Sequence, residues 1–290
     1  AGSSEVVPTV AAREVGDDDS MPTPHFVGRE ITELRVFQER LLVCSGPVVN
    51  ASRVSSFFNF WRTTVLTYPD DDSVEMYATG SEADTIRSSV IFDRSVVFAG
   101  DQQQYAISGK VPLTGSTATI MQSSAHRDAS AVRPVSMGEL LFFLKAGRAY
   151  VSAYQIAVGS VDDTSNSTEI SRQLHDYLSG QGVEMLGLSM PSMLLIRTNV
   201  PNTLYAFAFM DSGEQRVFDS WSRWLFNTGC GTLAGIGSYK DAPRMCFAKQ
   251  SGSNMLLSVL EVGLNNTVND LPHLDSWYYN GAFPVQAGEH

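Results

Sequence analysis

Three consecutive carboxylates, Asp70, Asp71 and Asp72, form the densest group of side chains in this sequence that could do chemistry. Clustered carboxylates bind hard cations, and pairs of carboxylates act as acid and base in glycoside hydrolysis. Hydrolytic propellers gather such groups from several blades, whereas these three follow Tyr68-Pro69 in one short segment. We interpret the triplet as a solvated turn, and we predict no catalytic and no metal-binding residue.

A second motif has the letters of a cofactor site without its context. Residues 229–234, G-C-G-T-L-A, match the dinucleotide-binding fingerprint. That fingerprint works only where a strand leads into a helix whose N-terminus faces the pyrophosphate. Gly235, Gly237 and Pro243 follow here, so we predict a turn between repeats and no cofactor.

The histidines do not form a ligand pair. None is four residues from another or next to a cysteine, and the five are His25, His126, His175, His273 and His290. The triplet His126-Arg127-Asp128 is interpreted as a polar strand end. The odd number of widely spaced cysteines (Cys44, Cys230 and Cys246) indicates buried free thiols and no disulfide framework.

Charge and hydropathy argue against two classes of protein, those that bind nucleic acid tightly and those that span a membrane. The chain of 290 residues has 31 acidic and 20 basic side chains, a net charge of −11, and no run of Lys or Arg. Tight binding to a nucleic-acid backbone needs clustered cations, so we exclude it. The acidic surface either keeps the protein in solution or lies near DNA without holding it. No segment approaches the ~20 apolar residues of a membrane span, and the first residues do not resemble a signal peptide, so we expect a soluble chain.

The elements that would position these residues repeat along the chain. Five similar units of strands and tight turns begin near residues 32, 86, 133, 183 and 232. A repeat of ~40–50 residues with several strands is typical of propeller blades. Pairs of turn residues fall between the strands at Glu39-Arg40, Asp93-Arg94 and Gly138-Glu139.

One segment has a helical pattern. Ser167 or Thr168 could cap a helix over residues 169–179, which Gly180 would end. We therefore predict an all-β chain, a β-propeller-like array of antiparallel hairpin blades with one short inserted helix. The domains would be an N-terminal arm or linker (1–24), the propeller (25–265), and a following segment or C-terminal tail (266–290).

A series of motifs in fixed order identifies a family. The N-terminal half contains F-V-G-R-E-I-T-E-L-R-V-F-Q-E-R-L-L-V-C-S-G (26–46), S-R-V-S-S-F-F-N-F-W (52–61) and Y-P-D-D-D-S-V-E-M (68–76). Further along are L-T-G-S-T-A-T-I-M-Q-S-S-A-H-R-D-A-S-A-V-R-P-V-S-M-G (113–138), E-Q-R-V-F-D-S-W-S-R-W-L-F (214–226) and L-P-H-L-D-S (271–276). Over about residues 24–285 this series resembles the tail tubular protein B family, the nozzle proteins of short-tailed bacteriophages.

The resemblance also assigns the aromatic cluster of S-S-F-F-N-F-W (55–61). It corresponds to the family's aromatic turn, in which Phe57, Phe58 and Phe60 would fill the space between neighbouring blades and Trp61 would cover an edge. The same covering is expected of the later pair, Trp221 and Trp224. The alternative is an aromatic platform for a sugar or single-stranded nucleic acid.

The resemblance implies a structural protein of the virion tail and no enzyme. It implies a homo-hexameric ring below an adaptor ring (tail tubular protein A-like), with tail fibres docked outside. Double-stranded DNA would pass through the lumen during ejection without tight binding, with no small-molecule substrate, and assembly would occur in the host cytoplasm. Candidate basic residues of the lumen are Arg87, Arg127 and Arg133. The alternative function is that of a carbohydrate-binding or carbohydrate-active β-propeller.

Overall fold

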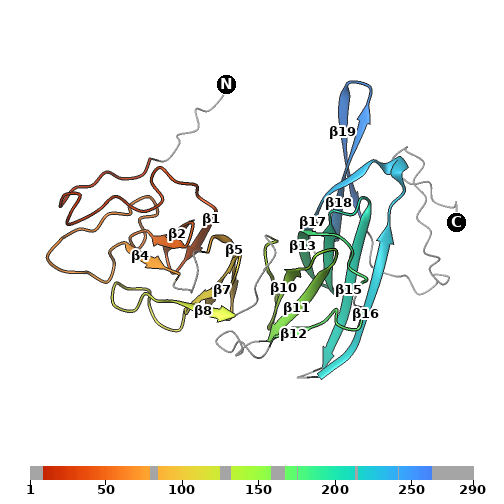
Figure 1. The fold of residues 1–290 in the computed structure, drawn as a ribbon, viewed down its shortest axis with the longest axis horizontal. Helices are drawn as coiled ribbons and strands as arrows, with labels where there is room; N and C mark the ends of the chain where they lie inside the picture. Colours follow the sequence, from red (N-terminus) through yellow and green to blue (C-terminus); the bar gives the residue numbers. More distant parts are fainter. Residues whose placement is uncertain are drawn as a thin grey trace. The chain divides into compact units, whose positions relative to one another are not determined.

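The chain forms two compact units in the computed structural model (Figure 1). One unit contains Ala1–Lys145 with Gln155–Thr168, and the other contains Ala146–Tyr154 with Glu169–His290. The structure describes residues 9–78, 84–124, 132–157, 167–174, 176–212, 215–240 and 242–262. The predicted domain boundaries, after residues 24 and 265, stay predictions.

Five antiparallel sheets follow one another along the chain, which confirms the propeller-like array of blades. In each sheet the strands pair in chain order, so every strand lies beside its neighbour in sequence. The first sheet comprises β1 (Glu33–Phe37), β2 (Arg40–Ser45), β3 (Val48–Ala51) and β4 (Val74–Tyr77). The second comprises β5 (Ile86–Phe92), β6 (Ser95–Gly100), β7 (Gln104–Ile107) and β8 (Ile120–Ser124).

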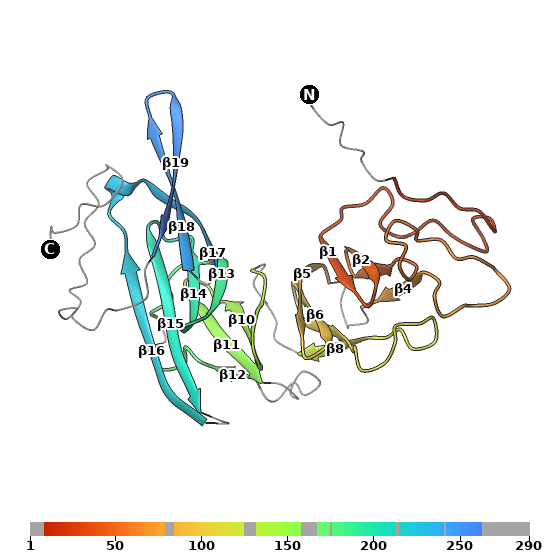
Figure 2. The same ribbon diagram turned by 180° about the vertical axis from the view of Figure 1, so that it is seen from behind.

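The remaining sheets complete the array (Figure 2). The third comprises β9 (Val135–Met137), β10 (Leu140–Ala146), β11 (Val151–Ala157) and β12 (Thr168–Glu169). The fourth comprises β13 (Gly182–Ser189), β14 (Ser192–Thr198), β15 (Thr203–Ser212) and β16 (Gln215–Leu225). A 3₁₀ helix, η1 (Thr228–Cys230), leads to the fifth, which comprises β17 (Thr232–Tyr239), β18 (Ala242–Ser251) and β19 (Asn254–Glu261).

Tight turns set the register of the hairpins. Asp93 and Arg94 have φ values of 43° and 60°, which two-residue turns of this kind require. Gly138 and Glu139 likewise separate β9 from β10, as predicted. In the first sheet the prediction was wrong by one residue, because Gln38 and Glu39 form the turn (φ 46° and 56°) and Arg40 begins β2. The one-residue shift places Arg40 in a strand and not in an exposed turn, and its side chain is buried.

The first strands of successive sheets lie side by side within each unit. In the first unit β1 contacts β5 and β5 contacts β9, and in the second unit β13 contacts β17. Apolar side chains fill the space between the neighbouring sheets of a unit. The core between the first two sheets includes the fully buried Leu42, Phe98 and Tyr105. The core between the fourth and fifth sheets includes the fully buried Leu195 and Leu204.

The predicted helix over residues 169–179 is wrong. Thr168–Glu169 forms β12, and the described residues after it form turns, in which Leu174 N–H donates to the Ser171 carbonyl. The backbone is instead tied to β11, because Ile170 N–H donates to the Ala153 carbonyl and Val151 N–H to that of Leu178. Pairing with a sheet edge outweighs the cap and spacing that indicated a helix.

Cys44 and Cys230 are buried free thiols, as predicted, and Cys246 is a half-buried free thiol. Burial raises the pKa of the Cys44 thiol well above its usual range, so it stays protonated in the core. None of the helices in the described residues has the length and apolar character that a membrane crossing requires.

Candidate functional site

Arg40 lies at the centre of a buried polar cluster in the first sheet. Arg40 is the first residue of β2 and is 1% exposed. Its side chain donates three hydrogen bonds to backbone carbonyls. Nη1 contacts the carbonyls of Ser52 and Asp72 at 2.7 and 2.6 Å, and Nη2 contacts that of Asp70 at 2.7 Å. The planar guanidinium fork thus joins β2 to both ends of the long connection between β3 and β4.

Asp72 holds the same connection from within. Its carboxylate is fully buried and accepts hydrogen bonds from the backbone N–H of Thr63 at 3.0 and 2.9 Å and from the Thr63 hydroxyl at 2.9 Å. Arg53 Nε lies 3.3 Å from the same carboxylate. Asp72 is therefore a structural carboxylate whose acceptor positions are filled by the protein.

The electrostatics of the cluster are balanced. Burial lowers the pKa of the Arg40 guanidinium, whereas the nearby charges of Asp71, Tyr68 and Asp72 act in the opposite direction. An arginine keeps its proton even so, because its pKa begins far above neutrality. Arg40 therefore contributes the cation that makes the buried carbonyls and carboxylate of this turn tolerable.

The acidic triplet is thus divided between two environments. Asp70 and Asp71 are exposed, as a solvated turn requires, whereas Asp72 is buried, so the prediction was wrong for Asp72. Among the described residues no group of three or more His, Cys, Asp or Glu side chains could hold a metal ion. The geometry of the triplet supports a structural role and provides no acid–base pair.

Phe60 is the aromatic residue that is buried in the cluster at residues 55–61. It is 7% exposed and packs edge-on against Phe26, with ring centroids 4.9 Å apart, beside Val43. Phe57 and Phe58 are 40% and 43% exposed, so the prediction that they fill the space between blades was wrong. The backbone turns here, with Ser55 at a φ of 57°.

The turn instead anchors the N-terminal segment. Ala11 N–H donates to the Phe58 carbonyl at 2.8 Å, and the Trp61 indole N–H donates to the Ala11 carbonyl at 2.7 Å. The Arg13 guanidinium lies over the Trp61 ring, 5.6 Å from its centroid. Met21, further along this segment, is buried. The described residues of the predicted arm therefore belong to the first unit.

Trp221 and Trp224 on β16 are both half-buried. The Trp221 ring packs on Phe207 with centroids 4.8 Å apart, and its N–H donates to the Ile170 carbonyl at 3.2 Å. Trp224 packs against the core of the fourth and fifth sheets. Both rings thus pack on faces of the fourth sheet, and the expected covering of a sheet edge stays a prediction.

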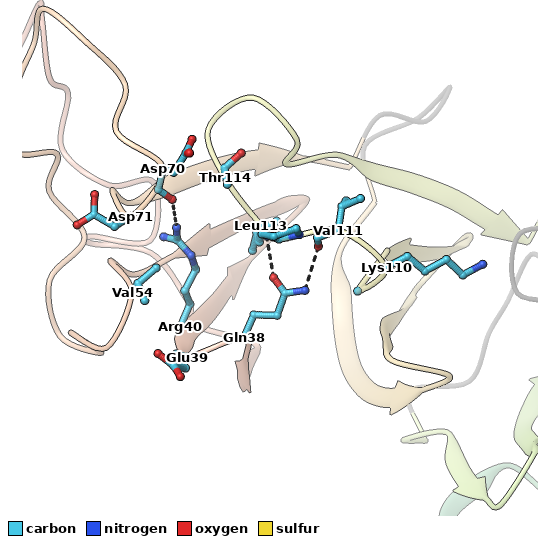
Figure 3. A pocket seen from close by; sticks show the side chains of 12 residues that line it. Gln38, Glu39, Arg40, Val54, Asp70, Asp71, Lys110, Val111, Leu113 and Thr114 are labelled. Carbon is cyan, nitrogen blue, oxygen red and sulfur yellow. Dashed lines mark hydrogen bonds between the residues drawn. The ribbon is translucent and has the colours of Figure 1, made fainter.

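An open pocket of about 620 Å³ lies beside the Arg40 cluster (Figure 3). Gln38 spans it, donating to the Val111 carbonyl at 3.1 Å and accepting from the Leu113 N–H at 2.7 Å. The wall continues into Gly109, where a Cβ would lie 1.7 Å from the Arg94 carbonyl oxygen. Gln38 thereby holds the second sheet's loop to the first sheet.

A buried and a half-buried carboxylate also join the first strands of neighbouring sheets, a feature that the sequence reasoning missed. Glu33 on β1 accepts from the Ser89 hydroxyl on β5 at 2.7 Å and from Arg133 at 2.8 Å. In the second unit, Glu184 on β13 accepts from the Ile236 N–H on β17 at 3.0 Å and from Arg197 at 3.1 Å. The available signal was a glutamate at the same early position of two repeats.

Two of the three arginines proposed for a lumen are neutralised within the first unit. Arg87 forms a two-point contact with Asp101 at 2.9 and 2.8 Å, and Arg133 is paired with Glu33. Arg127 lies outside the described residues, together with His126 and Asp128. Of the five histidines, His25 is described and contacts Arg29, whereas His126, His175, His273 and His290 are not described.

The fingerprint-like residues 229–234 form the turn between two sheets that the sequence predicted. They pass from η1 into β17 through Gly231, whose φ is 96°. Asn202 holds this turn, donating to the Gly231 carbonyl at 2.8 Å and accepting from the Leu233 N–H at 2.9 Å. The strand that follows excludes the helix N-terminus on which a pyrophosphate would bind.

Comparison with known proteins gives one family match and one curated relative. The family model of the bacteriophage nozzle protein matches residues 8–273. The tail tubular protein gp12 of Escherichia phage T7 is 22% identical over 224 residues, which are 77% of this chain and 28% of that protein. The chain therefore spans less than a third of the length of the curated relative.

Solved structures give weaker matches. Kluyveromyces lactis Hsv2p is 10% identical with a TM-score of 0.44, over 81% of this chain and 73% of that chain. A 6-phosphogluconolactonase-like protein from Bacteroides uniformis is 9% identical with a TM-score of 0.39, over 79% of this chain and 69% of that chain.

Proposed function

The chain belongs to the bacteriophage nozzle protein family, and we propose that it is a structural part of the tail of a short-tailed phage. The observation that carries the proposal is the family match over residues 8–273. It is supported by the role of the motif residues in the first sheet. Arg40, Asp72 and Phe60 all hold the backbone in place, and their hydrogen-bonding and packing capacity is used within the protein.

The proposed assembly is a homo-hexameric ring in the virion tail, formed in the host cytoplasm. In the proposal the ring meets an adaptor ring, carries tail fibres outside, and gives passage to double-stranded DNA during ejection. A closed ring needs two different complementary faces on each copy. Exposed apolar side chains such as Leu34 and Val36 on β1 and Phe218 on β16 provide surface for such contacts.

The protein is proposed to let DNA pass and not to bind it tightly. The net charge is −11, and Arg87 and Arg133 are already paired with carboxylates. A wall without free clustered cations leaves phosphates hydrated, so DNA moves along it with little resistance. In this role the protein has no catalytic residue, cofactor or small-molecule substrate.

Electron microscopy of the purified protein tests the ring. Six-fold ring particles with a central channel are expected, and particles that remain monomeric at every concentration would contradict the assembly. Immunogold labelling of virions tests the location separately, because label on the capsid and not on the tail would contradict the tail assignment.

A gel-shift titration with duplex DNA tests the conduit. We expect no sub-micromolar binding at physiological salt and no steep salt dependence, since each phosphate contact adds about −0.9 to the logarithmic salt slope. Tight, salt-sensitive binding by the protein would mean that it grips DNA.

A further inference from the structure

The open pocket beside the Arg40 cluster has apolar walls. They include Val54 and Val111, which are 36% and 48% exposed, and Pro112. Arg40 itself is buried, and the nearby Asp72 offsets its charge. The volume of about 620 Å³ lies within the range of about 300–1,000 Å³ that is common for ligand sites. The pocket is therefore large enough to hold side chains of another molecule.

The same pocket is lined by three exposed acidic residues, Glu39, Asp70 and Asp71, which we call the acidic rim. Arg53 Nη2 lies 3.4 Å from the Asp71 carboxylate, whereas no cation is paired with the other two carboxylates in the described part of the chain. Lys110 also lines the pocket, but its side chain extends away from the acidic rim (Figure 3). Negative charge is therefore in excess here, and the pocket suits a partner that is cationic and partly apolar.

The turn between β10 and β11 has the complementary character. Lys145 lies near the end of β10, and the exposed residues Arg148 and Tyr150 follow in the turn. Neither Lys145 nor Arg148 has a carboxylate partner among the residues that the structure describes. No acidic residue occurs in the sequence between Glu139 and Asp162. In an acidic chain, this turn therefore combines two unpaired cations with an aromatic ring that is 37% exposed.

Lys145 and the pocket lie at opposite ends of the strands of the first unit. The pocket is at the end where β1 turns into β2, since Gln38 of that turn lines it. Arg133, just before β9, contacts Glu33, the first residue of β1, so β1 and β9 begin at the same end. β10 is antiparallel to β9 and therefore ends where β9 begins. Complementary groups at opposite ends suit a head-to-tail contact between copies.

We propose that the turn at residues 145–150 of one copy docks in the acidic pocket of the next copy of this chain. Lys145 and Arg148 then meet the carboxylates of the acidic rim, and Tyr150 packs against the apolar wall at Val54 and Val111. The inference rests on the homo-hexameric ring proposed above. It supplies the two different faces that a closed ring needs, because each copy gives its turn to one neighbour and its pocket to the other.

Charge reversal in the full chain tests this contact, with self-association measured by analytical ultracentrifugation. Arg148→Glu and Asp70→Lys are each expected to weaken association at least about tenfold, because like charges then face each other. A mixture of these two variants should recover association to within about threefold of the unaltered chain, since the reversed turn of one variant meets the reversed pocket of the other. Arg172→Glu and Asp19→Lys reverse exposed charges elsewhere and should leave association unchanged.

The outcomes separate this contact from the ring itself. Association that both single variants retain would overturn the docking and leave the ring, because the pocket would then be free for another protein. Weakened association that the mixture fails to recover would also overturn the docking, since the two charges would not face each other between copies. A chain that stays monomeric at every concentration would overturn both proposals. The melting temperature shows whether each variant is folded, and Glu39→Lys replaces Asp70→Lys if that variant is not.

Discussion

Arg133 donates a hydrogen bond from Nη2 to Oε2 of Glu33 over 2.8 Å, so the segment before β9 is fixed to β1. The Glu33 side chain is 5% exposed and also accepts from Ser89 on β5. One carboxylate thereby joins the inner parts of three successive sheets. Arg133, which could have been counted as a free cation, is in fact paired with a buried carboxylate, although its own side chain is 59% exposed.

Glu33→Gln should weaken this junction. The amide keeps the shape of the side chain but loses the charge that attracts Arg133 and Arg35, so we expect a loss of about 1–3 kcal/mol in the free energy of unfolding. Urea denaturation measures it. Glu139→Gln, at an exposed turn position, is the control and should change stability by less than about 0.5 kcal/mol. Equal effects of the two changes would show that the junction is not stabilising.

Arg40→Lys should destabilise the first unit by at least about 3 kcal/mol, because an ammonium group cannot reach three carbonyls in the geometry of the guanidinium fork. Thermal unfolding followed by circular dichroism measures this change. Arg94→Lys, on the exposed turn between β5 and β6, serves as the matched control. A wild-type melting temperature for Arg40→Lys would refute the structural role given to this arginine.

Phe60→Ala and Phe57→Ala should separate the two halves of the aromatic turn. Loss of the buried Phe60 ring is expected to cost about 3–5 kcal/mol, as for other buried rings. Phe57 is 40% exposed, so its truncation should cost less than about 1 kcal/mol. Denaturant titrations of both variants measure the two losses of unfolding free energy. A larger loss for Phe57→Ala than for Phe60→Ala would mean that Phe57, and not Phe60, is the buried ring.

Trp61→Phe should release the N-terminal segment from the turn. The ring is retained while the hydrogen bond to the Ala11 carbonyl is lost, a change of about 1 kcal/mol and therefore about fivefold in local opening. Limited trypsin digestion, with cleavage after Arg13 quantified by mass spectrometry, measures the opening. Trp224→Phe should not alter this cleavage, and unchanged cleavage in Trp61→Phe would rule out the anchor.

High pH should destabilise the first unit through Tyr105. Burial, followed by the charge and hydrogen bond of Asp84, raises the pKa of this phenol above its ordinary value of 10.0. A raised pKa in the folded state means that the stabilisation is complete below pH 10 and is lost as the pH rises toward the folded-state value. Unfolding curves from pH 8 to 12 should show this loss, and Tyr105→Phe should make it shallower. A decline just as steep in Tyr105→Phe would assign it to other groups.

The positions of most strands were predictable, because apolar residues alternate along each copy of the repeat. The predicted starts at 86 and 232 coincide with β5 and β17, and the other three lie within two residues of a strand. The helix was mispredicted because local spacing cannot show that Ile170 finds a partner at Ala153. The polar clusters were missed for a similar reason. Glu33 and Arg133 are 100 residues apart in sequence and meet only in the folded unit, and nothing near either residue in sequence reveals the partner.

The pairing of every strand with its neighbour in sequence has a consequence for how the chain folds. Many of these strand pairs close through short turns, although the connection between β3 and β4 is long, and pairing between neighbours in sequence forms faster than pairing between distant strands. Each sheet is therefore expected to form soon after its own stretch leaves the ribosome, without waiting for distant segments. The ion pair between Glu33 and Arg133 would then form late, between sheets that are already complete. In this way the chain would expose its apolar edges only briefly during synthesis.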